Sequence, residues 1–222
     1  MKVPAQFKFL KDKNVYLIGP AMNALVKPNE YRDYDYIARL NMWLDCVKAP
    51  PRTDIVFLNV RAEALLAKNV NTNLNNKIII QKWTPAKIRR ARRKRNLLKR
   101  YPGSVVIGGG AHTRPWGYPG KHWYTYLGSY AMNVLLKFGA NVTYGGADFY
   151  YEGFGIGSNY PPGYDFGDMN NALPGEEDVI HKMKNDLYWI KNTLMVRYPG
   201  KLTMHEKTEY YFRKSLERYR IQ

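Results

Sequence analysis

Short apolar runs bounded by glycine or polar residues recur along the chain and predict buried β-strands. They lie at residues 15–18, 36–41, 54–59, 77–80, 104–107 and 142–144, and the last of these is the last clear strand signal. Segments with helical periodicity occupy residues 62–67, 85–100, 126–138, 176–194 and 206–220. Strands that alternate with helices predict an α/β fold, with a mostly parallel central sheet and helices on both of its faces.

Local signals support the helix ends and set the organisation of the chain. Thr84 can cap a helix that starts at Pro85, and Gly139 is a typical residue at the end of the next long helix. A chain of 222 residues is expected to form a single domain. Two long loops, at about residues 108–121 and 151–175, are rich in Gly, Pro and aromatic residues, and we expect them to act as lids.

Electric charge narrows the class of partner. The chain has 35 Lys and Arg residues against 18 Asp and Glu, a formal net charge of +17. The densest basic segment, residues 87–100, contains no acid, and like charges at helical spacing repel one another, so an anionic partner is expected. Its candidate contacts are Arg89, Arg90, Arg92, Arg93, Lys94 and Arg95. Nucleic acid, an anionic membrane surface and an anionic glycan all remain open at this point.

Several features bear on compartment. Cys46 is the only cysteine, so no intrachain disulfide can form. The first residues lack the apolar region of a signal peptide, and no run of 18 apolar residues exists. We therefore expect a cytoplasmic protein, in the host cell if its source is a virus. The basic amphipathic helix at about 205–220 either packs on the core or lies on a membrane surface, and His205 at its start is expected to be solvated.

Five segments resemble, in order and spacing, the sialyltransferases, especially the small bacterial ones. They are VYLIGPAMNAL (15–25), DYDYIARLN (33–41), DIVFLNV (54–60), YLGSYAMNVLLKFGANVTYGGADFYYEG (126–153) and HKMKNDLYWI (181–190). The resemblance covers about residues 14–194. It implies a sialyltransferase-like, GT-A-like fold and a metal-independent, inverting glycosyltransferase whose donor is a pyrimidine nucleotide-sugar, CMP- or UDP-linked. The donor is a substrate, and no further cofactor is implied.

The same resemblance implies roles for individual residues. His181 is the implied general base on the acceptor hydroxyl, a task that suits a group whose pKa lies near working pH. Tyr150 is the implied hydroxyl donor to the phosphate of the leaving group. Gly128 would let the donor approach the N-terminus of a helix, where backbone N–H groups favour an anion. The implied donor-binding residues are Gly19, Asn41, Asn59, Gly128, Gly146 and Tyr160.

The chain departs from the family's pattern around the donor. Pro20 stands where the family usually has Asn, and Leu127 where it has Ser or Thr. The family's second phosphate tyrosine aligns with Ile156, so Tyr160 or Tyr164 must substitute. These departures leave both the sugar and its carrier open.

Other residue types with chemical potential have simpler interpretations. Asp33 and Asp35 resemble the metal-binding Asp-x-Asp of other glycosyltransferases, but they precede a strand and are expected at the wrong edge of the sheet for a donor site. The three glycines at 108–110 lack the Lys-Ser/Thr of a phosphate loop. His112 and His122 lie in a loop rich in Gly and aromatic residues and are further site candidates.

Three functions follow in order of preference. The first is glycosyl transfer to a polyanion, most concretely to a hydroxymethylated base in phage or viral DNA. The second is glycosyl transfer to a glycan or a lipid-linked sugar at a membrane surface. The third is a non-enzymatic nucleic-acid-binding protein on the same fold.

Overall fold

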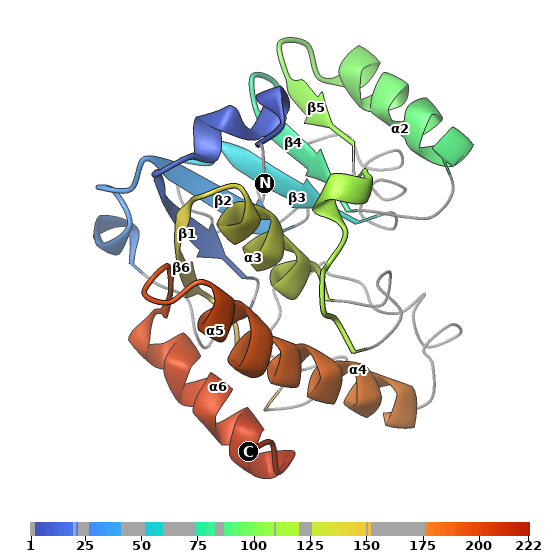
Figure 1. Cartoon of the computed structure of the whole chain (residues 1–222). Coiled ribbons are helices and arrows are strands. Elements are labelled where there is room, and N and C mark those ends of the chain that lie inside the picture. Colours follow the sequence, from blue (N-terminus) through green and yellow to red (C-terminus); the bar gives the residue numbers. More distant parts are fainter. Residues whose placement is uncertain are drawn as a thin grey trace.

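A computed structural model describes residues 3–19, 21, 27–40, 52–59, 74–82, 87–108, 110–119, 126–149, 151 and 176–222. Within these residues, seven strands form one sheet in the order β5-β4-β3-β2-β1-β6-β7, and every neighbouring pair is parallel (Figure 1). The strands are β1 (Asn14–Ile18), β2 (Tyr36–Leu40), β3 (Ile55–Leu58), β4 (Ile78–Gln81), β5 (Val105–Ile107), β6 (Asn141–Gly145) and β7 (Leu202–Met204). The predicted α/β class is therefore confirmed.

Helices connect or flank these strands. The α-helices with described bounds are α2 (Lys87–Arg100), α3 (Leu127–Lys137), α4 (Glu176–Trp189), α5 (Met195–Arg197) and α6 (Glu206–Arg218). A π-helical turn, η8 (Ile190–Leu194), joins α4 to α5. Short 3₁₀ helices occur at η1 (Ala5–Leu10), η3 (Pro28–Glu30) and η5 (Ala111–Thr113).

The strand order reverses once. From β1 the sheet grows in one direction through β2, β3 and β4 to β5, and the chain then returns to place β6 on the other side of β1. The carboxyl ends of β1 and β6 therefore flank a topological switch point, which is where parallel α/β sheets bind ligands.

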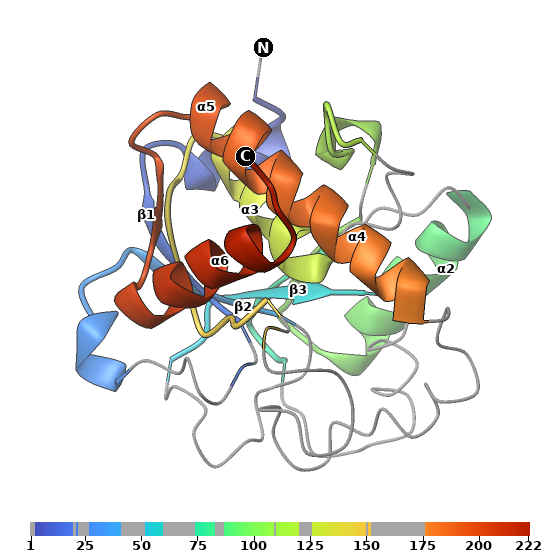
Figure 2. The same ribbon diagram turned by 90° about the horizontal axis from the view of Figure 1, so that it is seen from below.

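Both faces of the sheet are covered, which explains why its strands are almost continuously apolar. The larger core lies between one face and α3, α4 and α6, with η1 at its margin (Figure 2). Ten of the eleven residues of α3 are buried, because this helix lies between the sheet and the outer helices. On the opposite face, Leu97 of α2 and Tyr101 pack against β3, β4 and β5.

The sequence predicts most of these elements within one or two residues. The helix expected to end at Gly139 does so, since Gly139 has φ +98° and its N–H donates to Leu136 O at 3.0 Å. After residues 142–144, the last clear strand signal in the sequence, the structure adds one more strand, because β7 pairs with β6. The helix expected at 62–67 lies outside the described residues.

Among the described helices, none is long and apolar enough to cross a membrane.

Candidate functional site

The loops after β1 and β6 meet at the switch point. The N–H of Gly19 donates to Gly145 O at 2.7 Å, and the N–H of Ala21 donates to Gly146 O at 2.9 Å. A Cβ on Gly19 would collide with the carbonyl of Gly146, and a Cβ on Gly146 would lie 2.6 Å from Gly19 O. Both glycines are thus required by backbone-to-backbone packing, and any ligand here must bind beyond this contact.

The turn after β6 holds an unusual backbone. Gly146 has φ +69° and Phe149, a bulky residue, has φ +51°. A non-glycine residue in this region costs about 1–2 kcal/mol, and such strain gathers at functional sites. Contacts hold the turn in place: the N–H of Ala147 donates to the Thr208 hydroxyl at 3.3 Å, and Phe149 packs against the ring of Phe212. The turn leads directly into Tyr150, which lies outside the described residues.

The N-terminus of α3 lies at the same edge, because α3 precedes β6 and runs opposite to it. Gly128 faces the Tyr144 side chain of β6, where a Cβ would lie 2.5 Å from the Tyr144 hydroxyl. The glycine therefore allows close packing between helix and strand. Its expected role in approaching a donor phosphate stays a prediction.

A buried carboxyl group caps this helix. Asp186 of α4 is 1% exposed, and its two oxygens accept a hydrogen bond from the Tyr118 hydroxyl at 2.6 Å and from the Tyr126 N–H at 3.0 Å. The Ser129 hydroxyl is a third donor. Because the positive end of a helix dipole favours an anion, the carboxylate of Asp186 interacts favourably with the first turn of α3.

Burial controls the ionisation of this group. Removal from water raises the pKa of Asp186 to about 6, whereas the Ser129, Tyr118 and Tyr126 donors and the charge of Lys82 oppose the rise. A carboxyl with a pKa near 6 exchanges its proton close to neutral pH. Buried titratable groups of this kind are candidates for functional roles, although structural networks also produce them.

The described part of the loop at 108–121 is fastened to α4. The Trp189 indole N–H donates to Trp116 O at 3.0 Å, and the Tyr118 ring packs edge-on against Trp189 at 5.4 Å. Arg197 lies over the exposed Trp116 ring at 4.2 Å. Together with the hydrogen bond from Tyr118 to Asp186, these contacts hold this stretch of chain beside the N-terminus of α3. That this loop closes as a lid stays a prediction. The second expected lid, at 151–175, lies outside the described residues except for Tyr151.

A histidine–carboxylate pair lies at the carboxyl end of β7. His205 follows this strand, and its Nε2 lies 2.6 Å from a carboxylate oxygen of Glu30 in η3. Its Nδ1 is buried without a hydrogen-bond partner among the described residues. The expectation that His205 is solvated is met only in part, because its side chain is 22% exposed while Nδ1 is buried. Through this contact with Glu30, His205 ties η3 to the end of β7.

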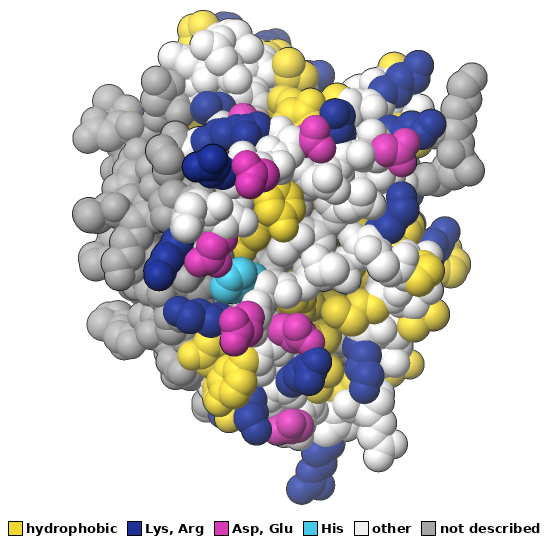
Figure 3. All heavy atoms as spheres, turned by 90° about the vertical axis from the view of Figure 1, so that its left-hand side faces the viewer, with side chains coloured by type: hydrophobic (Ala, Val, Ile, Leu, Met, Phe, Trp, Pro, Cys, Tyr) yellow, Lys and Arg dark blue, Asp and Glu magenta, His cyan; other side chains and the backbone are white. Residues whose placement is uncertain are grey.

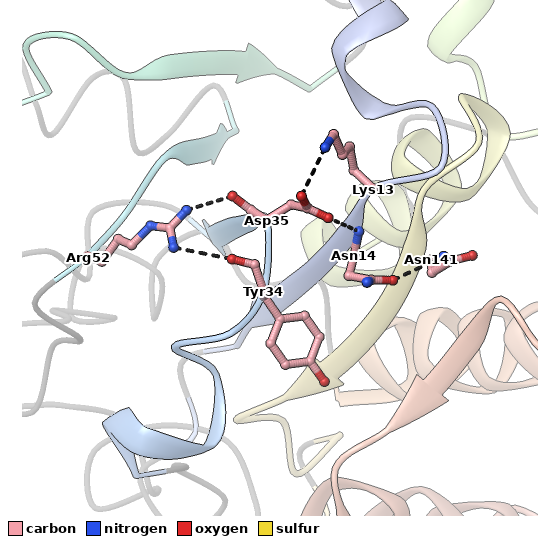
Figure 4. A network of polar contacts seen from close by, with 6 residues as sticks. All are labelled: Lys13, Asn14, Tyr34, Asp35, Arg52 and Asn141. Atoms are coloured by element: carbon pink, nitrogen blue, oxygen red, sulfur yellow. Dashed lines mark hydrogen bonds and ion pairs between the residues drawn. The ribbon is translucent and has the colours of Figure 1, made fainter.

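A polar network at the opposite, amino edge contains one of the two acids suggested by the Asp-x-Asp pattern (Figure 4). Asp35 accepts the Asn14 N–H at 2.8 Å and the Lys13 ammonium at 3.0 Å, and these two donors lower the pKa of its carboxyl. Arg52 donates to the carbonyls of Tyr34 and Asp35 at 3.2 and 2.6 Å. Asp35 thus joins the starts of β1 and β2, at the edge expected from the sequence.

The remaining candidates fall into three groups. Asn59 directly follows β3 at the carboxyl edge. His181 lies in the first half of α4, where the structure describes the backbone and not the side chains. Asn41, Tyr150, Tyr160 and His122 lie outside the described residues. His112 lies away from the carboxyl edge: its ring contacts Gln6 and Phe7 of η1, and burial lowers its pKa.

The basic candidates all lie on α2. Arg92, Lys94 and Arg95 are exposed and Arg93 is half-buried, whereas for Arg89 and Arg90 only the backbone is described. The described residues contain no group of three or more His, Cys, Asp or Glu side chains arranged to hold a metal ion.

Models of known protein families and the curated proteins were compared with this sequence, and none matches it.

Sequence reasoning missed Asp186, although a signal existed. Met183, Leu187 and Ile190 form the buried stripe of α4 and its continuation, and Asp186 occupies a position within that stripe. An acid on the apolar face of a helix indicates a buried, hydrogen-bonded carboxyl. No comparable signal exists for the partner of His205, because β7 itself is too short to recognise.

Proposed function

We propose that this protein is a sialyltransferase-like glycosyltransferase, which moves a sugar from a pyrimidine nucleotide-sugar to an acceptor hydroxyl with inversion. One observation carries the proposal. Gly19, Asn59 and Gly146 come from separate parts of the sequence and lie at one edge of a parallel sheet, around its switch point. His181 belongs to α4, and this helix starts on the same side of the sheet because it precedes β7. This is the edge at which such sheets bind ligands.

The proposed reaction is a single displacement. His181 takes the proton from the acceptor hydroxyl as the acceptor oxygen bonds to the anomeric carbon. The bond from that carbon to the phosphate oxygen breaks, and the nucleotide leaves with the electron pair. Tyr150 donates its hydroxyl to the departing phosphate, so hydrogen bonds do the work that a metal ion does elsewhere. The strained turn ending at Phe149 supports this assignment, because it fixes the chain immediately before Tyr150.

The proposed acceptor is a hydroxymethylated base in DNA. The net charge of +17 supports a polyanionic acceptor, since it raises the local concentration of phosphate backbones. A base that is modified within a duplex must be flipped out or reached through a groove.

A transfer assay tests this proposal. Labelled CMP- and UDP-sugars are incubated with DNA that contains or lacks hydroxymethylated bases, and label is expected only on the modified DNA. His181→Ala should abolish most of the transfer, whereas His112→Ala, a histidine removed from the carboxyl edge, should retain it. Equal activity of the His181→Ala and wild-type proteins would refute the assignment of the base.

A second candidate is a non-enzymatic nucleic-acid-binding protein. The favouring observation is that Asp186 already places a carboxylate at the N-terminus of α3, which opposes a phosphate at that position. This candidate requires DNA binding with no consumption of any nucleotide-sugar.

A further inference from the structure

The positive charge of this protein is concentrated in one stretch of sequence. Between Glu63 and Asp148 there are 15 Lys and Arg residues and no acid, whereas the rest of the chain has 20 basic and 18 acidic residues. Fifteen of the net 17 positive charges therefore belong to this stretch. Its described elements are β4, α2, β5, η5, α3 and β6. Because α3 is buried, α2 is the surface helix on which this charge gathers.

The outer side of α2 is basic and not neutralised. Arg92, Lys94, Arg95 and Lys99 are exposed, and none of them has an ion-pair partner among the described residues. On the side of the molecule away from α2, acidic and basic side chains are interspersed (Figure 3). The contrast gives α2 an attraction for anions that the opposite side lacks.

The apolar side of α2 is already used by the fold. Leu97 is 6% exposed and packs against the sheet, which leaves Leu98, at 43% exposed, as the apolar side chain facing outward in the described part of the helix. An interfacial membrane helix inserts an apolar face among lipids, and the part of α2 whose side chains are described, residues 92–100, presents no such face. Residues 87–100 also contain no aromatic side chain on which unpaired bases could stack. These features favour the phosphate backbone of a duplex.

The shape of the helix fits this partner. Lys94, Arg95, Leu98 and Lys99 lie together around a shallow, open depression on this helix. Fourteen residues make a rod about 21 Å long, comparable with the span of several phosphates along one strand. Since α2 follows β4 and precedes β5, it runs from the carboxyl edge of the sheet to the amino edge. A duplex held along it reaches the edge that carries the candidate donor site.

We propose that the outer side of α2, defined by Arg92, Lys94, Arg95 and Lys99, binds the phosphate backbone of double-stranded DNA without reading its sequence. The proposal that this surface binds DNA is argued from its charge and geometry. The further step, that it presents a DNA base as the acceptor, rests on the proposed function. Four side chains that each displace a counterion give a slope of log K against log salt of about −4 from this surface.

Duplex binding is measured by fluorescence anisotropy without nucleotide-sugar, on two unrelated DNA sequences and at several salt concentrations. The test variant replaces the four α2 residues by Gln. The control replaces Lys8, Lys11, Lys184 and Lys207, which are exposed and lie outside the acid-free stretch, so that both variants lose four charges. Thermal unfolding and pyrimidine-nucleotide binding of each variant are measured in parallel.

The proposal predicts similar affinity for both DNA sequences and a large loss of affinity in the α2 variant only, with a slope reduced by about 3–4. Nucleotide binding should be unchanged. Equal losses in the two variants, or strong preference for one DNA sequence, would each overturn it. Binding to phosphatidylserine vesicles is measured alongside, and an α2 variant that keeps its affinity for DNA and loses only its affinity for these vesicles would also overturn it. If DNA binding behaves as predicted but no nucleotide-sugar is bound or consumed, the surface stands and the proposed glycosyl transfer fails.

Discussion

Replacing Asp186 by Asn probes the buried carboxyl at the N-terminus of α3. The substitution keeps the shape of the side chain and removes its charge. Near pH 4 the carboxyl of the folded protein is protonated and neutral, so the two proteins differ little in charge at this position. Near pH 7 only the wild-type protein keeps a negative charge there, enclosed by Tyr118, Ser129 and the N–H of Tyr126.

The magnitude follows from the two pKa values. The pKa of Asp186 rises from 3.8 to about 6 on folding because burial disfavours the charged form. Between these values the folded protein binds more protons than the unfolded chain, so its free energy of unfolding falls as pH rises. The rise in pKa from 3.8 to about 6 corresponds to a loss of roughly 3 kcal/mol in the free energy of unfolding, which is complete above pH 6. The amide of the Asp186→Asn variant does not titrate and has no such pH dependence.

Urea unfolding at pH 4, 5, 6 and 7 measures the difference. The free energy of unfolding of the variant, relative to wild type, should increase by up to about 3 kcal/mol from pH 4 to pH 7. Its absolute value also includes the altered hydrogen bonds, which is why the trend with pH is diagnostic. Asp33→Asn, which removes an exposed carboxyl, is the control for net charge. A difference between Asp186→Asn and wild type that stays constant with pH would refute the reasoning.

Three further substitutions test contacts of the fold. Gly128→Ala should destabilise the protein by about 1–3 kcal/mol through overpacking against Tyr144, and adding Tyr144→Phe should restore part of the loss in urea unfolding. The Asn14 N–H and then Lys13 lower the pKa of Asp35 in the folded protein. Its charge therefore stabilises the fold fully above pH about 4, and this stabilisation is lost as pH falls through the folded pKa. Asp35→Asn should make unfolding at acid pH, followed by circular dichroism, depend less steeply on pH. Trp189→Phe removes an indole hydrogen bond to the loop at 110–119 and should cost about 1–2 kcal/mol, with faster limited proteolysis in that loop.

The elements that the sequence predicts well are those with a strong local pattern. The first strand, with its exit at Gly19, and the helix that ends at Gly139 combine an apolar run with a residue suited to the turn. By contrast, β7 has three residues, and its place in the sheet depends on pairing with β6, a contact that no local pattern contains. The placement of Asp35 at the amino edge was predictable because it precedes a parallel strand.

The candidate site is predicted less completely because its geometry depends on contacts between distant segments. The mutual packing of Gly19 and Gly146 requires β1 and β6 to be neighbours, which the strand order alone decides. The same holds for Asp186, whose partner Tyr118 is 68 positions away in the sequence. The local sequence does predict that the glycines and asparagines after the strands lie at one edge of the sheet.

Thermal unfolding with nucleotides tests for a pyrimidine nucleotide-sugar site at the carboxyl edge of the sheet. The protein is heated with CMP, CDP, UMP, UDP and the corresponding purine nucleotides. At about 100 times its dissociation constant, a ligand that binds only the folded protein adds about 2.7 kcal/mol to the free energy of unfolding. A cytidine or uridine nucleotide should raise the melting temperature, and purine nucleotides should not. An unchanged melting temperature with every pyrimidine nucleotide, or an equal rise with purines, would contradict the proposed site.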